Sequence, residues 1–234
     1  MALRNATANT RETAVARHLS QVFNYMAGGV GLSGIVAWLT VNSPALLQVA
    51  IKGNLVFMLV WLAFGFFMHR IVFSLQPAVA LGVFAAFSAL TGFSLAPLML
   101  VYTGASIATA FGVAAVMFAG ASLYGYVTNK SLSGWGTFLM MGVWGLLGAM
   151  LINLGFALFG SPLAGLQTVI SIIAVPLFAA LTAYNVNQIK ETFAMYGGNE
   201  LMRSRLAILN ATSLYINFLN MFIQLLSLIG VRRD

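Results

Sequence analysis

Seven long apolar segments, joined by short polar connections, run along the chain. A transmembrane helix needs about 20 predominantly apolar residues to cross the hydrocarbon core of a bilayer. The segments that meet this length lie at residues 22–41, 55–73, 77–95, 106–127, 135–159, 166–189 and 208–229. The pattern predicts an all-α polytopic membrane protein with one seven-helix domain at 22–230, a polar N-terminal tail at 1–21 and a short C-terminal tail at 231–234. We see no secretory signal peptide in the polar N-terminal residues.

Polar side chains recur along the seventh segment with helical spacing. They follow one another at intervals of 3, 4, 3, 4 and 3 residues and are Asn210, Ser213, Asn217, Asn220, Gln224 and Ser227. This spacing places all six on one face of a helix, which we call the polar stripe. Because an amide without a partner in hydrocarbon costs kilocalories, the stripe must face other helices or water. We therefore predict that helix seven is central, and two interpretations of the stripe stay open: hydrogen bonding between helices, or a polar permeation path.

The sixth segment carries a matching polar face. Its members are Thr168, Ser171, Thr182 and Asn185. Pro176 lies between them and leaves the carbonyl of Ile172 without its helical hydrogen bond, so a kink or local opening is expected. Asn185, near the end of the sixth segment, and Asn217, in the first turns of the seventh, belong to the same membrane edge and are expected to be neighbours.

Small residues share one face in several segments, where they are expected to let helices of this chain pack closely. In the first segment they are Gly28 and Gly31, with Gly34 nearby. In the fifth segment they are Gly142, Gly145 and Ala149.

Composition and charge support a membrane protein. The 234 residues are 61% hydrophobic and 6% charged, whereas soluble domains carry about a quarter charged residues. The net charge of +7 comes from single, scattered basic residues, so we expect no nucleic-acid partner. With the N-terminus inside, eight basic residues lie in inner segments and only Lys52, Arg232 and Arg233 in outer ones. This asymmetry predicts a cytoplasmic N-terminus and an outer C-terminus, and a re-entrant last segment is the alternative.

The chemistry of most enzymes is missing from the apolar segments. All four acidic residues lie in tails or loops: Glu12, Glu191, Glu200 and Asp234. Ser122 has no base at its depth, because both histidines, His18 and His69, belong to the inner edge. Cysteine is absent, which excludes disulfides and thiolate metal sites. We therefore predict that the protein is not an enzyme, has no cofactor and has no assignable metal site.

Three stretches of the sequence together identify a family. They read "YTGASIATAFGVAAVMFAGASLYGYVTNKSLSGWGTFLMMG", "LTAYNVNQIK" and "SLYINFLNMFIQLLSLIG". In this order and spacing they resemble the Bax inhibitor-1, or transmembrane Bax inhibitor motif, family. The resemblance implies seven helices with helix seven at the centre, and a pH-sensitive calcium leak across a membrane. Animal and plant relatives suppress cell death at the endoplasmic reticulum, and some bacterial relatives modulate a membrane-bound protease.

The resemblance also assigns candidate gate and sensor positions. The sensor of the family is a pair of aspartates, and the matching positions here hold Asn185 and Asn217. A basic residue that engages the pair in some members falls on His69 or Arg70. Two close carboxylates share a proton over a physiological range, whereas two amides cannot titrate.

The resemblance therefore implies a passive calcium-permeable leak along helices six and seven, with proton gating lost or weakened. Calcium would be the permeant ion and the lipid bilayer the surrounding partner. The alternative is a non-transporting interaction protein that modulates a quality-control membrane protease or a cell-death or stress partner. The short tails suggest a bacterial member in the inner membrane.

Overall fold

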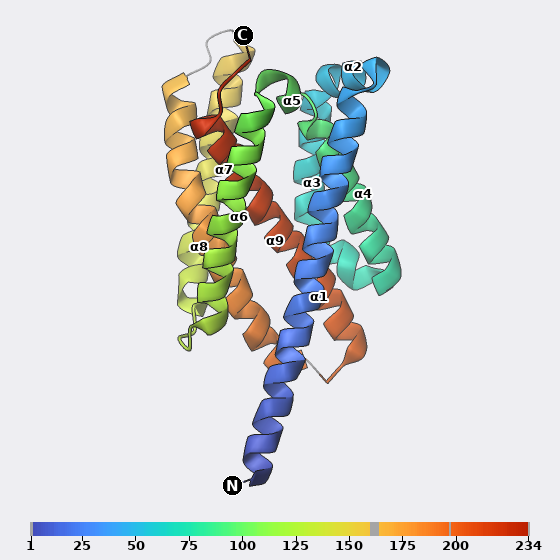
Figure 1. Cartoon of the computed structure of the whole chain (residues 1–234), viewed down its shortest axis with the longest axis vertical. Coiled ribbons are helices and arrows are strands. Elements are labelled where there is room, and N and C mark those ends of the chain that lie inside the picture. Colours follow the sequence, from blue (N-terminus) through green and yellow to red (C-terminus); the bar gives the residue numbers. More distant parts are fainter. Residues whose placement is uncertain (1, 160–163, 197, 234) are drawn as a thin grey trace. The chain divides into compact units, whose positions relative to one another are not determined.

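Helices account for nearly all of the computed structural model, which describes residues 2–159, 164–196 and 198–233; among these, the side chains of residues 2–12, 54, 158 and 164 are outside the description. The long helices are α1 (Ala2–Val41), α3 (Asn54–Ser74), α4 (Pro77–Leu95), α6 (Gly104–Val127), α7 (Gly136–Leu158), α8 (Ala164–Tyr196) and α9 (Glu200–Ile229) (Figure 1). The short elements are α2 (Pro44–Lys52), α5 (Leu98–Val101) and the 3₁₀ turn η1 (Ser133–Trp135). Among the described residues, the seven long helices are apolar and long enough to cross a membrane, which confirms the predicted fold class.

Three of the spans are longer than the apolar pattern predicts. α1 begins at Ala2, so the segment predicted as a polar tail continues as helix. α9 begins at Glu200, eight residues before its apolar stretch, because Asn199 caps it. The Asn199 side chain accepts a hydrogen bond from the Met202 amide at 3.0 Å, and Glu200 places negative charge in the first turn, where the helix dipole favours it. α8 likewise continues to Tyr196.

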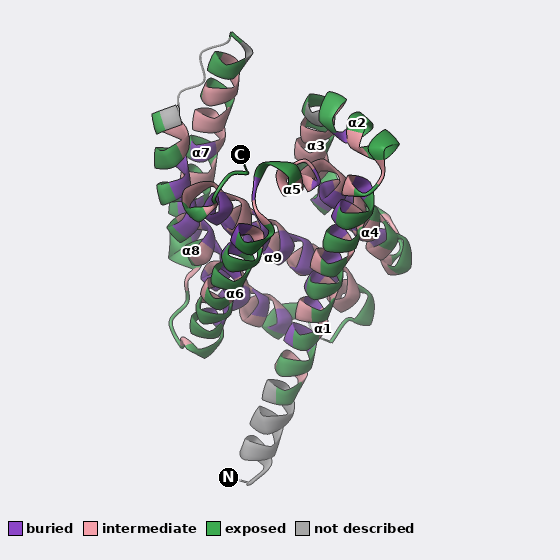
Figure 2. Ribbon diagram, turned by 45° about the horizontal axis from the view of Figure 1, so that its top comes forward, coloured by how far each residue is buried: buried purple, intermediate pink, exposed green. Residues whose placement is uncertain are grey.

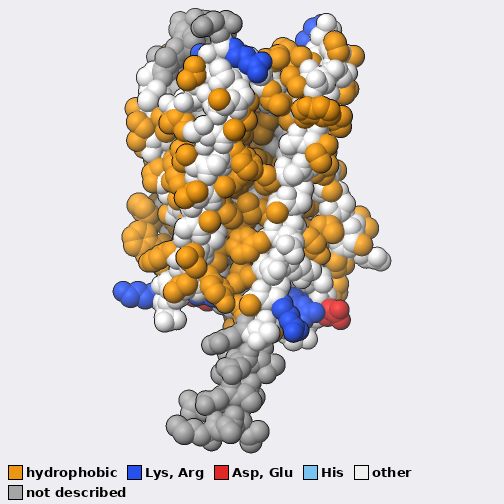
Figure 3. All heavy atoms as spheres, viewed as in Figure 1, with side chains coloured by type: hydrophobic (Ala, Val, Ile, Leu, Met, Phe, Trp, Pro, Cys, Tyr) orange, Lys and Arg blue, Asp and Glu red, His pale blue; other side chains and the backbone are white. Residues whose placement is uncertain are grey.

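Contacts between residues divide the chain into two units. Unit one comprises Met1–Leu100 and Ile189–Tyr215, and unit two comprises Val101–Gln188 and Ile216–Asp234. The boundaries fall inside α8 and α9, so each of these helices contributes one part to each unit. On the face shown in Figure 3, hydrophobic side chains cover the long helices and the charged side chains lie at helix ends.

In unit one, α1 and α4 pack at close range. A Cβ atom at Gly92 of α4 would collide with the backbone carbonyl of Ser33 in α1, so only glycine permits this approach. Gly29 similarly lies against Phe84 and Ser88. The prediction of close packing at Gly28 and Gly31 was wrong, because a Cβ atom at either position meets nothing within 4 Å. The contacting glycine of that run is Gly29, which is about 100° around the helix from Gly28.

In unit two, glycines again mark the close contacts. Gly125 of α6 lies against the backbone of Ala183 in α8, and Gly142 of α7 lies against the side chain of Leu177. The chain after α9 forms an isolated antiparallel bridge between Arg232 and Tyr102. The bridge lies directly after the half of α9 that carries Asn217, Asn220, Gln224 and Ser227.

Candidate functional site

The polar stripe of α9 is buried or partly buried along its length. None of its six residues is exposed, and Asn217 and Gln224 are only 5% and 4% exposed. Of the seven spans, α9 has the largest buried share, 56% of its most apolar window. Figure 2 shows buried residues recurring along this helix. The stripe therefore faces protein, as its spacing predicts.

Five polar side chains of unit two form an amide cluster: Asn153, Gln167, Ser171, Gln224 and Ser227. They come from α7, α8 and α9. The hydroxyl of Ser171 donates to Gln224 Oε1 at 2.7 Å, and both residues are buried. Gln167 Nε2 donates to the hydroxyl oxygens of Ser171 at 3.4 Å and Ser227 at 3.5 Å.

The far end of the amide cluster has a free acceptor. Asn153 Nδ2 donates to Gln167 Oε1 at 3.3 Å. Asn153 Oδ1 is buried and has no hydrogen-bond partner in the described part of the chain. Sequence reasoning missed Asn153 and Gln167. The available signal was that Gln167 precedes Ser171 by four residues on the same helical face, and that Asn153 is an isolated amide in an apolar helix.

The two sensor positions, Asn185 and Asn217, both belong to unit two. Asn217 is buried, and its Nδ2 has no hydrogen-bond partner among the described residues. Asn185 is half-buried, and within the described chain no hydrogen bond joins it to Asn217. Their proposed pairing stays a prediction.

The remaining predicted positions make local contacts within their own helix or are exposed. Asn220 Nδ2 donates to the carbonyl of Ile216 at 2.8 Å, within α9. His69 and Arg70 are exposed near the end of α3 in unit one, where the His69 ring lies 4.7 Å from that of Phe73. Pro176 is exposed, and α8 continues through it without interruption of the helix.

The unit-one half of the stripe contains Asn210 and Ser213. Ser213 donates to the carbonyl of Leu209 at 3.1 Å, and Asn210 Nδ2 is buried without a partner among the described residues. The stronger polar contact of this half is at Tyr215, which is fully buried. Its hydroxyl lies 2.6 Å from that of Ser33 in α1. Ser33 can also donate to the carbonyl of Ser88 or of Gly29, at 2.7 and 2.9 Å, and when it does so Tyr215 is the donor to Ser33.

Asn187, in the same run as Asn185, has a structural role that its sequence position did not reveal. Its Oδ1 accepts from the Leu132 amide at 2.9 Å, and its Nδ2 donates to the Lys130 carbonyl at 3.2 Å. The side chain thereby holds the connection between α6 and η1 against α8.

The chemistry of the site is that of neutral oxygen and nitrogen groups. Within the described residues, no group of three or more His, Cys, Asp or Glu side chains is placed to hold a metal ion. Hard cations such as Ca²⁺ prefer oxygen ligands, and carboxylates usually dominate a site that retains them. Neutral amides and hydroxyls are suited to brief contact with a hydrated cation rather than to tight binding.

Comparison with known proteins agrees with the geometry. A sequence model of the family described as "Inhibitor of apoptosis-promoting Bax1" matches residues 15–234. The chain is 35% identical to the inner membrane protein YbhL of Escherichia coli K12, covering 92% of each chain. It is 37% identical to an uncharacterized protein of Caulobacter vibrioides, covering 91% of this chain and 88% of that protein. An uncharacterized protein of Borreliella burgdorferi is 32% identical, with 93% of each chain covered.

Proposed function

Because this chain belongs to the Bax inhibitor-1 family, we propose that it is a passive calcium-permeable leak of the inner membrane whose proton gate is lost or weakened. The observation that carries the proposal is the amide cluster. Three membrane-spanning helices bring amides and hydroxyls together, and one acceptor, Asn153 Oδ1, is left without a partner among the described residues. A buried polar group of this kind is costly in a helix bundle unless it meets water or an ion.

The same proposal explains the neutral sensor positions. Asn217 presents a buried amide with an unpartnered N–H donor where a carboxylate would titrate. Asn185 and Asn217 are similar in size to aspartates but do not gain or lose a proton in this range, so the calcium leak should vary little between about pH 5 and 8. His69, at the end of α3, is the other candidate gate position and is tested beside the pair.

The decisive experiment is calcium entry into liposomes that contain the purified chain. We expect entry above the level of empty vesicles, and a loss of flux in the Gln224→Leu variant on the order of threefold, because each polar contact in a membrane contributes about 0.6 kcal/mol. The matched control is Ile173→Leu, a volume-conserving change at an exposed position of α8. A protein that folds but admits no calcium would contradict the leak. Together with capture of a membrane protease from native membranes, this result would support the interaction-protein alternative.

A second arm tests the sensor positions. Replacing Asn185 and Asn217 together by aspartate should create two coupled carboxylates and make calcium flux depend on pH. Each single aspartate variant should show a weaker dependence, because it lacks the like-charge partner. If the native chain is already steeply pH-dependent and His69→Gln does not change this, the assignment of the gate to these positions is wrong.

A further inference from the structure

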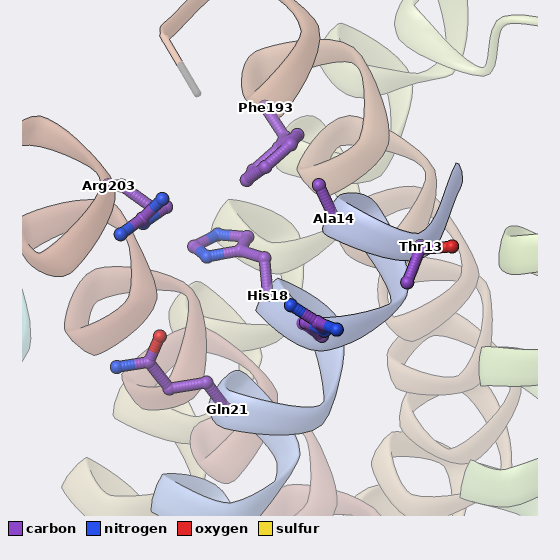
Figure 4. A pocket seen from close by; sticks show the side chains of 7 residues that line it. Thr13, Ala14, His18, Gln21, Phe193 and Arg203 are labelled. Carbon is purple, nitrogen blue, oxygen red and sulfur yellow. The ribbon is translucent and has the colours of Figure 1, made fainter. Parts of the chain in front are cut away.

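A pocket of about 510 Å³ lies in unit one, apart from the amide cluster. Its wall is formed by Arg17, His18 and Gln21 of α1, Phe193 of α8 and Arg203 of α9. Figure 4 shows the His18 ring and the Arg203 guanidinium facing one another from different helices, with Gln21 beside the same opening. α1 and α9 thus bring basic and amide groups to one hollow, and α8 adds the ring of Phe193.

His18 is the buried member of this group. It is 4% exposed, and its ring lies 5.1 Å from that of Phe193, which fixes its orientation. Its Nδ1 is buried and has no hydrogen-bond partner among the described residues. Gln21 is held as well, since its Nε2 donates to the Tyr25 hydroxyl at 2.9 Å. The pocket therefore contains polar side chains that are already positioned, one of which lacks a partner.

The described wall of the pocket carries positive charge. Arg17 and Arg203 are both present, and no carboxylate is among the lining residues whose side chains the structure describes. In the part of the chain whose side chains are described, neither arginine forms an ion pair with Asp or Glu. Guanidinium groups present several N–H donors in a fork that matches phosphate oxygens.

The depth of the pocket in the membrane indicates the source of the phosphate. Arg203 precedes the apolar stretch of α9 by five residues, and Phe193 follows that of α8 by four. When the ends of these apolar stretches are taken as the edge of the hydrocarbon core, a rise of about 1.5 Å per residue puts these positions roughly 6–8 Å beyond it. This is the headgroup layer of a bilayer. We propose that Arg17, His18, Gln21 and Arg203 form a binding site for a phosphate group, and that the phosphate belongs to the headgroup of an anionic phospholipid.

The test measures binding to the full chain in a neutral detergent by titration calorimetry. The probes are a short-chain phosphatidylglycerol, the matching phosphatidylcholine, and inorganic phosphate. The variant Arg17→Gln/Arg203→Gln should bind phosphatidylglycerol about 10- to 30-fold more weakly than the native chain, because each basic residue near a lipid surface contributes about 1 kcal/mol. The control, Lys52→Gln/Lys130→Gln, removes the same charge from exposed positions outside the pocket and should bind as the native chain does.

A third variant distinguishes binding at this pocket from general attraction between a basic protein and an anionic lipid. His18→Phe keeps both arginines and the contact with Phe193 but removes the imidazole nitrogens, and should weaken binding on the order of tenfold. Phosphatidylglycerol should bind more tightly than phosphatidylcholine. Tight binding of inorganic phosphate together with no binding of phosphatidylglycerol would support a phosphate site. It would refute the proposal that the phosphate belongs to a lipid. Equal binding by the native chain and a folded Arg17→Gln/Arg203→Gln variant would overturn the proposal, and so would equal losses in that variant and the lysine control. None of these outcomes depends on whether the protein conducts calcium.

Discussion

Replacing Asn187 by leucine removes both hydrogen bonds that hold the connection after α6 to α8. Asn187 is 3% exposed, and its amide serves the Leu132 N–H and the Lys130 carbonyl at the same time. A net contribution of about 1 kcal/mol per hydrogen bond, or somewhat less at a membrane protein, gives a loss of about 1–2 kcal/mol. For a chain of this size, 1 kcal/mol corresponds to about 2–4 °C in Tm, so we expect Tm to fall by about 2–8 °C. Asn187→Asp keeps the acceptor for Leu132 but sets a second oxygen against the Lys130 carbonyl, so it should not restore the native Tm.

Thermal unfolding of the purified chain, followed by circular dichroism, measures this effect. Amide hydrogen exchange at Leu132 reports the specific bond, since exchange should accelerate in Asn187→Leu. The control is Asn129→Leu, an exposed asparagine in the same connection, which should leave both quantities unchanged. If the two leucine variants have equal Tm values, or if Leu132 exchanges at the native rate in Asn187→Leu, the two hydrogen bonds of Asn187 do not stabilise the fold.

Three further predictions concern packing and topology. Gly92→Ala should lower Tm by many degrees, because its Cβ would collide with a backbone carbonyl of α1, whereas Gly28→Ala should be neutral or slightly stabilising. A double-mutant cycle with Tyr215→Phe and Ser33→Ala should give a coupling free energy of about 0.6 kcal/mol in thermal unfolding. A coupling of zero would show that the hydrogen bond between Tyr215 and Ser33 does not stabilise the protein. A cysteine at Asn129 should be protected from a membrane-impermeant thiol reagent in intact cells and react after lysis. Labelling in intact cells would reverse the predicted orientation.

The fold was largely predictable because lipid imposes a simple rule on sequence. A span must be long, apolar and helical, so seven segments could be counted directly. The ends of the helices were harder to predict from the sequence. The start of α9 depends on the Asn199 cap and not on hydrophobicity, and polar residues extend α1 and α8 beyond the apolar stretches.

The candidate site was predictable only where polarity is periodic. The stripe of α9 was found from its spacing, and its burial follows from the cost of an unpaired amide in hydrocarbon. The partners across helices, Asn153 and Gln167, were not found because single amides carry no period. Asn185 and Asn187 look equivalent in sequence. Because they are two positions apart, their side chains are separated by about 200° around the helix and point to different neighbours. Only Asn187 reaches the connection after α6.

The polar stripe of α9 also has a consequence for biosynthesis. A helix with amides along one face enters a bilayer poorly by itself, because those groups need partners there. α9 follows the other spans in chain order, so Ser171 of α8 has already emerged from the ribosome when its stripe partner Gln224 arrives. Ser33 of α1 has likewise emerged before Tyr215, a polar residue of α9 outside the stripe. Insertion of α9 is then coupled to docking on the earlier helices. A substitution at Ser33 should therefore lower the amount of correctly inserted protein in cells more than the stability of the molecules that do insert.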